Sequence, residues 1–299
     1  MCGLAGSVGP APASEATLAR MTSRLAHRGP DDERFYRDGP VAFGFRRLSI
    51  IDLEGSPQPM STPEGELTCV FNGEIYNFAS LRRDLAARGH AFRTNGDTEV
   101  LLYAWREYGE RMLEHLQGMF AFAIWDRRAQ RLFVARDHIG VKPLYYHWDG
   151  RTLVFGSELK ALIEHPRVSR SIDLDALGLY LECQYIPSPK TIYRSVRKLE
   201  PGHALTVQGG TLSLRQYWKP DYSRKFEFGE AEALGRLESE LRRSVQSMLV
   251  SDVPLGSFLS GGVDSSLVSA LMADIAQRPI DTFTLGFHGA SARIDGFRH

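Results

Sequence analysis

Cys2 is the residue of this chain with the most reactive combination of groups. A small residue at position 2 normally allows the initiator methionine to be removed, which leaves Cys2 with a thiol and a free α-amine. A free thiol has a pKa of about 8.5 and is a weak nucleophile at neutral pH unless a base assists it. An α-amine, with a pKa of about 7.7–8.0, is suited to be that base. Cys2 therefore has the groups for attack on a carbonyl carbon, although a cysteine near the start of a chain is more often an ordinary one.

A second group of chemically useful residues forms the loop 260–266, with the sequence Ser-Gly-Gly-Val-Asp-Ser-Ser. It lies between a short apolar run and a helical pattern, where backbone N–H groups and the helix dipole favour a phosphate. It is neither a Walker A loop, because no lysine follows the glycines, nor a G-x-G-x-x-G loop. Asp264 would repel phosphate unless a cation lies between them, which suggests Mg²⁺. A plain strand-to-helix turn with Asp264 as the N-cap is the alternative.

The composition restricts the class of protein. The 299 residues suggest about two domains, and 43% hydrophobic with 24% charged residues is typical of a soluble globular protein. Lys plus Arg equals Asp plus Glu, at 36 each, so net charge favours neither nucleic acid nor an anionic membrane as a partner. No secretory signal or apolar run of about 20 residues is visible. Three widely spaced cysteines fit the reducing cytoplasm and do not have the spacing of a metal site.

The elements that must position these groups follow from apolar periodicity. A strand is expected at 3–9, and a helix from Ser14 to His27 that ends at the breaker pair Gly29-Pro30. Helices are also expected at about 78–89 and 98–116. Further short strands are expected at 41–47, 67–72, 119–125, 131–136, 144–147 and 152–156. Strands, then helices, then strands again indicate an α+β domain and not a parallel sheet.

The second part of the chain has a different pattern. Residues 209–229 are polar and are predicted to be a linker between a domain at 1–208 and a region at 230–299. That region begins with a helix from about Glu230, followed by a strand at 257–259, the loop 260–266, a second helix and a strand from Thr282 to Phe287. This order is typical of a parallel α/β unit. Two strands and two helices cannot cover both faces of a parallel sheet, so we expect an incomplete domain.

Loop 260–266 and the preceding run 251–256 closely resemble the pyrophosphate-binding loop of ATP pyrophosphatases, as found in glutamine-hydrolysing asparagine synthetases. The resemblance implies the beginning of an α/β synthetase domain of the PP-loop type, which uses ATP and Mg²⁺. It also implies a set of ATP-binding residues in and beside the loop, namely Leu259, Ser260, Gly261, Gly262, Asp264, Ser265 and Leu285.

The N-terminal region resembles the N-terminal-nucleophile (Ntn) glutaminase domain of the same enzymes. Each matching block alone would be weak evidence, but the number of blocks in register is strong evidence. The blocks lie at 1–3, 27–31, 47–52, 72–77, 96–99, 117–122, 136–146 and 198–203. The resemblance implies an αββα sandwich of the Ntn hydrolase type.

The resemblance also assigns roles. It makes Cys2 the nucleophile, and it places the oxyanion hole at the Asn72 side-chain amide and the Gly73 backbone N–H. Free glutamine carries both charge signs. Arg47 would bind its α-carboxylate, and Asp97 with Glu74 would bind its α-ammonium. The less favoured alternative for Arg47 alone is a salt-bridge partner on the surface, and that for Asp97 alone is an N-cap.

One histidine and two further cysteines are of residue types that often act in catalysis, but we assign them no catalytic role. His27 begins one of the matched blocks, but the α-amine already supplies a base, so we expect His27 to be structural. Cys69 lies in a predicted strand and is expected in the core. Cys183 is given no role.

The function implied is that of a glutamine-dependent asparagine synthetase, a ligase of asparagine biosynthesis with glutamine, aspartate and ATP as partners. Glutamine cleavage at Cys2 would supply ammonia to a β-aspartyl-AMP intermediate. The tail 288–299 does not resemble the continuation of the family, so we predict a truncated or frameshifted product, or a fragment, that retains at most glutaminase activity.

Two alternatives and one question stay open. The chain is the glutaminase half of an amidotransferase that acts on another carboxylate, or it is a non-catalytic remnant. Loop 260–266 argues against glucosamine-phosphate synthase and phosphoribosyl-pyrophosphate amidotransferase, which have no ATP pyrophosphatase domain. The sequence leaves the oligomeric state open, a homodimer included.

Overall fold

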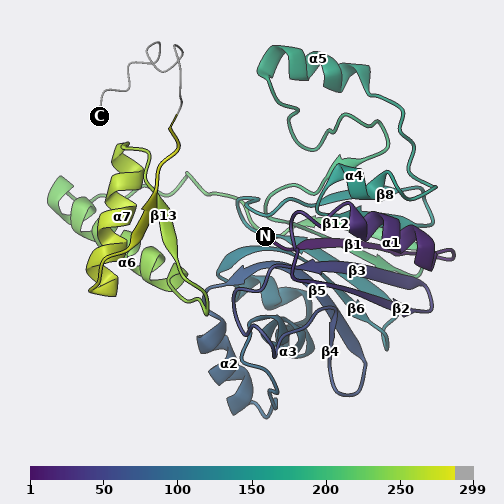
Figure 1. The fold of residues 1–299 in the computed structure, drawn as a ribbon, viewed down its shortest axis with the longest axis horizontal. Coiled ribbons are helices and arrows are strands. Elements are labelled where there is room, and N and C mark those ends of the chain that lie inside the picture. Colours follow the sequence, from purple (N-terminus) through teal and green to yellow (C-terminus); the bar gives the residue numbers. More distant parts are fainter. Residues whose placement is uncertain (287–299) are drawn as a thin grey trace. The chain divides into compact units, whose positions relative to one another are not determined.

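The computed structural model describes residues 1–286, and the chain divides into two compact units, Met1–Asp221 and a second that begins at Tyr222. The first unit contains groups of consecutive strands separated by helices (Figure 1). Its strands are β1 (Gly3–Val8), β2 (Asp32–Asp38), β3 (Val41–Arg47), β4 (Met60–Ser61), β5 (Leu67–Ile75), β6 (Gly118–Asp126), β7 (Arg131–Arg136), β8 (Tyr145–Trp148), β9 (Leu153–Gly156), β10 (Arg197–Lys198), β11 (His203–Gln208) and β12 (Thr211–Gln216). Its helices are α1 (Glu15–Ser23), α2 (Phe78–Ala87), α3 (Thr98–Tyr108), a 3-10 helix (Gly109–Glu114), α4 (Leu159–Leu162) and α5 (Leu174–Cys183).

The strands of this unit form two six-stranded antiparallel sheets. The first has the order β10-β8-β9-β1-β3-β2, and the second has the order β12-β11-β7-β6-β5-β4. β1 lies between β3 and β9, so its backbone is hydrogen-bonded on both sides. β5 pairs with β6 along its whole length, from Leu67 opposite Asp126 to Ile75 opposite Gly118. Four of the six residues predicted to act on glutamine belong to these strands or adjoin them: Cys2 immediately precedes β1, and β5 carries Asn72, Gly73 and Glu74.

Apolar side chains form three separate layers of core. One layer lies between the sheets and includes Leu4, Phe43, Val70 and Trp125. A second layer packs α1 and α4 on the outer face of the first sheet, and a third packs α2 and α3 on the outer face of the second (Figure 1). The order helix, sheet, sheet, helix is the αββα sandwich, so the predicted α+β class is confirmed.

Helix ends differ from the predicted ends for identifiable reasons. α1 begins after Ser14, whose hydroxyl accepts a hydrogen bond from the Thr17 N–H at 3.2 Å, as an N-cap does. The predicted helix 98–116 is wrong beyond Tyr108, because Gly109 has a φ of +56° and the chain continues as a 3-10 helix. Met112 and Leu116 are nevertheless buried, which explains why their spacing suggested a longer helix.

Residues 211–216 lie in the range predicted as a linker, but they form β12, which pairs with β11 in register from Thr211 opposite Gln208. This edge strand has few buried side chains, so its composition is that of a polar connection. The domain limits 1–208 and 230–299 stay predictions.

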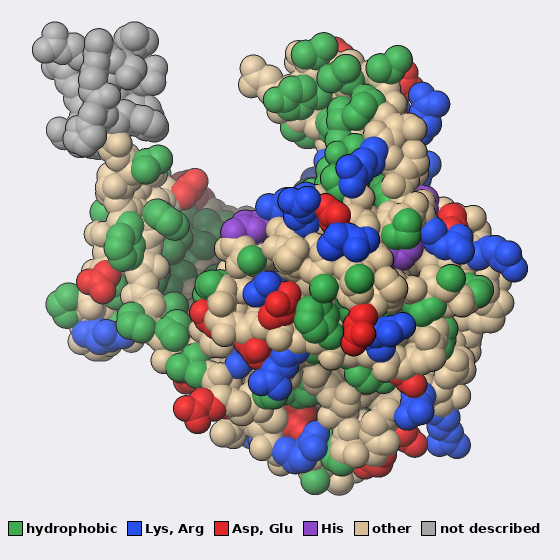
Figure 2. Space-filling model, turned by 45° about the vertical axis from the view of Figure 1, so that its right-hand side comes forward, with side chains coloured by type: hydrophobic (Ala, Val, Ile, Leu, Met, Phe, Trp, Pro, Cys, Tyr) green, Lys and Arg blue, Asp and Glu red, His purple; other side chains and the backbone are tan. Residues whose placement is uncertain are grey.

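α5 is an apolar helix that leaves much of its surface uncovered. Leu174 is 70% exposed, Tyr180 50% and Leu181 75%. Figure 2 shows hydrophobic side chains gathered on the lobe that this segment forms at the top of the view. Only Ala176 of this helix is buried, so α5 adds little to the core of the unit.

The described part of the second unit contains α6 (Glu230–Met248), β13 (Gly256–Phe258), α7 (Val263–Ala276) and β14 (Asp281–Phe283). β13 and β14 pair in parallel, which confirms the predicted α/β unit, and α6 packs on α7 through Val245, Leu271 and Met272. Phe258 is 83% exposed and Phe283 58%, so this two-stranded sheet leaves apolar side chains uncovered. Phe287 and the tail 288–299, which enter the predictions of the last strand and of truncation, lie outside the described residues. Within residues 1–286, no helix combines the length and the apolar character that crossing a membrane requires.

Candidate active site

A small cavity at the start of β1 brings together most of the residues predicted to act on glutamine. It is formed by β1, β3, β5, the N-terminus of α3 and the loop after β3. The residues lining it are Cys2, Arg47, Leu48, Ile50, Ile51, Ser56, Gln58, Phe71, Gly73, Glu74, Asp97 and Thr98. Five of the six glutamine-site residues named from the sequence are in this set, and the sixth, Asn72, is the neighbour of Gly73 on β5.

The Cys2 thiol is held against the backbone of Leu48. Its sulfur accepts a hydrogen bond from the Leu48 N–H at 3.4 Å and contacts the Leu48 carbonyl oxygen at 3.5 Å. Burial raises the pKa of this thiol, and the nearby Glu74 carboxylate raises it further. Cys2 is therefore a thiol in the resting state and requires a base before it can attack.

Arg28 fixes the backbone beside the thiol. Its Nε donates to the Cys2 carbonyl oxygen at 2.9 Å, and its Nη1 donates to Glu158 at 3.0 Å. Burial lowers the pKa of the Met1 ammonium, and the charges of Lys142 and Arg28 lower it too. His27 does not take part in this arrangement, because its Nε2 pairs with Glu158 at 2.9 Å.

Arg47, at the end of β3, is buried, with 8% of its surface exposed. Its guanidinium donates to the carbonyl oxygens of Leu53 at 2.6 Å and Asp52 at 2.8 Å. These bonds hold the loop after β3 around the cavity. Across the residues that the structure covers, no carboxylate forms an ion pair with Arg47, so its charge is not neutralised by a neighbouring side chain.

Two carboxylates that line the cavity, those of Glu74 and Asp97, are near enough for their charges to interact. Asp97 precedes α3, is 6% exposed and accepts a hydrogen bond from the Ile75 N–H at 3.0 Å. Burial raises the pKa of Asp97 to about 6, even though backbone N–H groups and Arg47 favour its charged form. Burial and the charge of Asp97 raise the pKa of Glu74 to about 8. Such a pair is poised to accept a cation, which would favour the charged form of both groups.

The loop that precedes Asp97 is tied to the loop after β3. The Asp52 carboxylate accepts from the N–H groups of Gly55 at 3.1 Å and Asn95 at 2.8 Å and from the Ser56 hydroxyl at 2.8 Å. A side chain at Gly96 would place its Cβ 2.3 Å from the Ser56 oxygen, so the two loops meet without space for one. The loop that Arg47 binds and the loop that precedes Asp97 are thereby fixed relative to each other.

Asn72 and Gly73 are adjacent on β5. Asn72 is 1% exposed, and neither its Oδ1 nor its Nδ2 has a hydrogen-bond partner in the described chain. A Cβ at Gly73 would lie 2.2 Å from the Met119 carbonyl oxygen, so only glycine fits there. An amide that is buried without partners costs free energy, and such groups are uncommon outside functional sites.

Two residues near the cavity received no role from sequence reasoning. They are Arg28, which binds the Cys2 backbone, and Lys142, which is 5% exposed. Both lie in blocks that were matched, at 27–31 and 136–146. The sequence signal available for Lys142 was its place next to Pro143 and Leu144, at the start of an apolar run. A lysine in such a run is a candidate for burial, and lysine is rarely buried without a specific reason.

The predicted ATP-binding residues lie at the C-terminal end of β13, in the loop and at the N-terminus of α7. Gly261 has a φ of +79°, Gly262 is the N-cap of α7, and the Ser260 and Ser265 hydroxyls are 3.0 Å apart. The Leu259 N–H donates to the Phe283 carbonyl at 2.9 Å, which ties the start of the loop to β14. Leu285 lies just beyond β14 and is 81% exposed.

This loop fits a phosphate group by the chemistry of its donors. It offers serine hydroxyls and the N-terminus of a 14-residue helix. Asp264 is in the first turn of α7, at a position where a cation between it and a phosphate would be needed. No cluster of three or more potential metal-ligating side chains occurs in residues 1–286.

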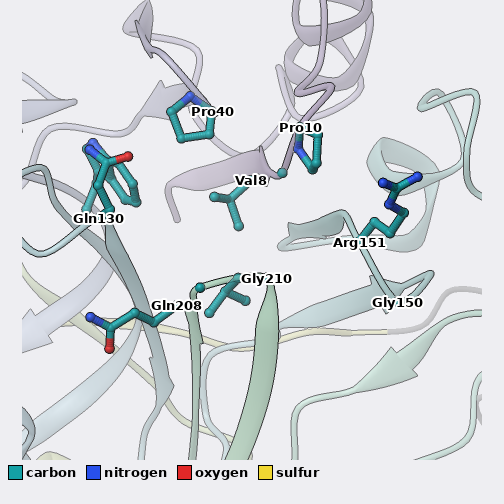
Figure 3. A pocket seen from close by; sticks show the side chains of 12 residues that line it. Val8, Pro10, Pro40, Gln130, Gly150, Arg151, Gln208 and Gly210 are labelled. Carbon is teal, nitrogen blue, oxygen red and sulfur yellow. The ribbon is translucent and has the colours of Figure 1, made fainter.

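A larger cavity, of about 520 Å³, lies elsewhere in the first unit and is a different site. Figure 3 shows Val8, Pro10 and Pro40 on one side of it and Gln208 with Gly210 on the other. Val8 ends β1, whereas Cys2 precedes β1, so the two cavities are separated by the length of this strand, roughly 20 Å. None of the catalytic or binding residues predicted from the sequence lines this larger cavity.

Comparison with known proteins agrees with the geometry. The family model for the glutamine amidotransferase domain matches residues 1–218, and the model for asparagine synthase matches residues 236–296. Glutamine-hydrolysing asparagine synthetase 3 of Bacillus subtilis strain 168 is 38% identical over 297 residues, which is 96% of this chain and 48% of the relative. Asparagine synthetase 1 of the same strain is 39% identical over 293 residues, 96% of this chain and 46% of the relative. The chain thus spans about half the length of the curated relatives it matches.

Among solved structures, the glutamine phosphoribosylpyrophosphate amidotransferase of Bacillus subtilis has a TM-score of 0.53 and 19% identity, with 99% of this chain and 71% of that chain covered. At this identity the likeness concerns the fold alone. The resemblance drawn from the motif blocks is confirmed by the family models and by the curated relatives.

Proposed function

Because this chain belongs to the glutamine amidotransferase family, in the form that occurs in glutamine-hydrolysing asparagine synthetases, we propose that its first unit hydrolyses glutamine at Cys2. The second unit supplies the beginning of a synthetase site that uses the ammonia. The chemistry of the first unit can be followed group by group.

Cys2 is the nucleophile once Met1 is removed. Its α-amine accepts the thiol proton as the sulfur bonds to the side-chain amide carbon of glutamine, and the same proton then goes to the departing nitrogen. The C–N bond breaks, ammonia leaves and a glutamyl thioester remains. Water cleaves the thioester to glutamate and restores the thiol. Burial lowers the pKa of the ammonium of Met1, the residue before Cys2. Similar surroundings around the α-amine of Cys2 would favour its neutral form, which a base near neutral pH requires.

Asn72 and Gly73 stabilise the oxyanion that forms at the first step. The unpartnered Nδ2 of Asn72 supports this role, since a donor without a partner in the resting state is free to bind charge as it develops. Asn72 lies on β5, which contacts β1 across the core between the sheets, and Cys2 immediately precedes β1.

The charged groups select a free amino acid. Arg47 binds the α-carboxylate, and the Glu74–Asp97 pair binds the α-ammonium. Both carboxylates must ionise to do so, and the arriving ammonium favours their ionisation because it lowers their raised pKa values. A substrate that lacks either charge leaves a buried charge without a partner, which disfavours its binding.

In the second unit, we propose that Leu259, Ser260, Gly261, Gly262, Asp264, Ser265 and Leu285 belong to an ATP site. The loop would hold phosphates through hydroxyl and backbone N–H groups, and Asp264 would hold Mg²⁺, which offsets the phosphate charge. The full reaction is the ATP-dependent amidation of aspartate through a β-aspartyl adenylate. Glutamine, aspartate and ATP are therefore the proposed small-molecule partners, and the cytoplasm is the proposed location.

The observation that carries the glutaminase proposal is the convergence of a partly buried thiol and both charge signs on one small cavity, with the unpartnered amide of Asn72 on the adjacent residue of β5. Ammonia release from glutamine by the purified full chain tests it, alongside Cys2→Ala and the control Cys183→Ala, which removes an exposed cysteine of α5. We expect activity in the wild type and in Cys183→Ala and none in Cys2→Ala. Intact-mass spectrometry should show that Met1 is absent. Equal ammonia release by Cys2→Ala contradicts the proposal.

A further inference from the structure

Asp52 lies in the loop after β3 with a backbone conformation that few residues with a side chain adopt. Its φ is +51°, in the left-handed region, which aspartate enters more readily than most residues. A residue keeps such a conformation where the contacts around it determine it, and such residues are common at functional sites. The backbone of Asp52 contacts one charged residue of the candidate site, and its side chain contacts the loop that precedes another.

The backbone of this loop holds the guanidinium of Arg47. The Asp52 carbonyl oxygen accepts a hydrogen bond from Arg47 Nη2 at 2.8 Å, and the Leu53 carbonyl oxygen accepts one from Nη1 at 2.6 Å. The carbonyl oxygen of Ile51 lies 3.4 Å from Nη2. Three successive carbonyl groups therefore fix the position of the positive charge that is proposed to bind the α-carboxylate of glutamine.

The side chain of Asp52 holds the loop that precedes Asp97. Its Oδ2 accepts from the Asn95 N–H and the Ser56 hydroxyl, both at 2.8 Å, and its Oδ1 accepts from the Gly55 N–H at 3.1 Å. Burial raises the pKa of this carboxyl group, but the hydrogen bonds to it lower the pKa more, so Asp52 is charged at neutral pH. Asn95 lies two residues before Asp97, so the Asp52 carboxylate fixes the entry to the residue that is proposed to bind the ammonium.

One residue thus connects Arg47 and Asp97, which lie far apart in the sequence. A free α-amino acid carries its carboxylate and its ammonium on the same carbon atom, so the separation of the two charges is fixed. A cavity whose charged groups are already held at the matching separation binds both charges without first ordering its loops, which increases the affinity for that ligand. A ligand with only one of the charges gains nothing from the connection.

We propose that Asp52 is a positioning residue that holds Arg47 and Asp97 at the separation of the two charges of an α-amino acid, and so selects free glutamine over amides that carry one charge. The inference rests on the proposed function, because it concerns the substrate of the same cavity. Asp52 is not one of the residues that line this cavity, so it acts through the two loops and not by contact with the substrate.

The test compares the full wild-type chain with Asp52→Asn and with the control Asp149→Asn. Asparagine has the size of aspartate and tolerates a positive φ, but one carboxylate oxygen becomes an NH2 group, which cannot accept a hydrogen bond from the loop. Asp149 is a matched control, because its carboxylate also accepts from two backbone N–H groups, those of Arg151 at 2.9 Å and Thr152 at 2.8 Å. This turn between β8 and β9 does not line the small cavity.

The first readout is the protection of Cys2 from alkylation by iodoacetamide, which yields the Kd of a ligand without turnover. The ligands are L-glutamate, which has both α-charges, glutarate, which lacks the ammonium, and 4-aminobutanoate, which lacks the α-carboxylate. In the wild type and in Asp149→Asn, L-glutamate should bind about 10–100-fold more tightly than the other two, the effect of a hydrogen bond to a charged group. In Asp52→Asn this ratio should fall by about tenfold, because the Kd rises for L-glutamate and changes little for the other ligands.

The second readout is ammonia release from glutamine, in which the KM of Asp52→Asn should rise by about the same factor while kcat changes less. If the wild type releases no ammonia, the proposed function fails, yet the binding ratios still decide the role of Asp52. Equal binding of the three ligands by the wild type, or equal weakening of all three in Asp52→Asn, would overturn the inference.

A second variant covers the case in which circular dichroism shows that Asp52→Asn is unfolded. Ser56→Ala removes one hydrogen-bond donor to the same carboxylate and leaves Asp52 in place. It should lower the ratio in the same direction but by a smaller factor. An unchanged ratio in this variant would also overturn the inference.

Discussion

We expect replacement of Asn72 by alanine to lower kcat strongly and to leave the free energy of unfolding almost unchanged. Loss of one oxyanion-hole donor typically lowers kcat by about 10²–10³, or roughly 2.7–4 kcal/mol of transition-state stabilisation. The side-chain amide of Asn72 is buried and has no partner within the described residues, so its removal breaks no hydrogen bond of the resting enzyme. Relief of an unpaired buried amide, worth about 1–3 kcal/mol, offsets the loss of packing, which is of similar size. We therefore expect the free energy of unfolding to change by less than about 1 kcal/mol.

Gln58 is the matched control, because it is a buried amide on the wall of the same cavity that does have partners. Its Oε1 accepts from the Phe71 N–H at 2.6 Å, and its Nε2 donates to the Thr98 hydroxyl at 3.2 Å. Gln58→Met leaves both partners buried and unsatisfied, at a cost of about 1–3 kcal/mol for each. This variant should lose stability clearly, whatever happens to its activity.

The assays are ammonia release at saturating glutamine, which gives kcat, and urea unfolding followed by circular dichroism, which gives the free energy of unfolding. The expected pattern is a large fall in kcat at nearly unchanged stability for Asn72→Ala. A kcat of Asn72→Ala within tenfold of the wild-type value, or a fall in its free energy of unfolding equal to that of Gln58→Met, would refute the assignment. Asn72 would then not be an oxyanion donor that has no hydrogen-bond partner in the resting enzyme.

Three further outcomes are expected. Asp97→Asn should raise the KM for glutamine by about 10–100-fold, which is the effect of losing a hydrogen bond to a charged group, while kcat changes less. Steady-state kinetics measures both constants. An unchanged KM would mean that Asp97 does not bind the ammonium. Because burial and Asp97 raise the pKa of Glu74 from 4.5 to about 8, the folded unit binds more protons than the unfolded chain between these values, and the free energy of unfolding falls as pH rises through this window. Urea unfolding at pH 5 and pH 8.5 should differ less for Glu74→Gln than for wild type, and an equal difference would contradict the raised pKa. Limited proteolysis should cut first within residues 219–229, because this segment is largely exposed and lies outside helices and strands. The resistant core should end after β12. A first cut inside β11 or β12 would contradict the observed sheet.

Buried strands were the elements of the fold that the sequence predicted most readily. β3, β5, β6 and β7 are continuous apolar runs, because each has a covered face on both sides of its sheet, and periodicity or composition reveals such runs. β2 was missed because its sequence, Asp-Glu-Arg-Phe-Tyr-Arg-Asp, carries the charges of an exposed edge strand. β12 was taken for part of a linker for the same physical reason.

The site itself was predicted through motif resemblance and not through spacing. Arg47, Glu74 and Asp97 come from three elements, and nothing in their separation along the chain indicates that they meet. Lys142 illustrates the limit most clearly. Its block was matched, but a lysine has the same appearance in the sequence whether its side chain is exposed or, like that of Lys142, almost wholly covered. Only the folded structure shows which of the two applies.

The position of β1 has a consequence for how activity is lost on heating. All six residues of this strand are buried, and β3 and β9 bond to it on either side, so the nucleophile is attached to a strand that cannot detach alone. Amide hydrogens of Gly3 to Val8 should exchange with deuterium only when the whole sandwich opens. Thermal inactivation and global melting of the first unit should then be a single event, so residual turnover after heating counts the molecules that are still folded.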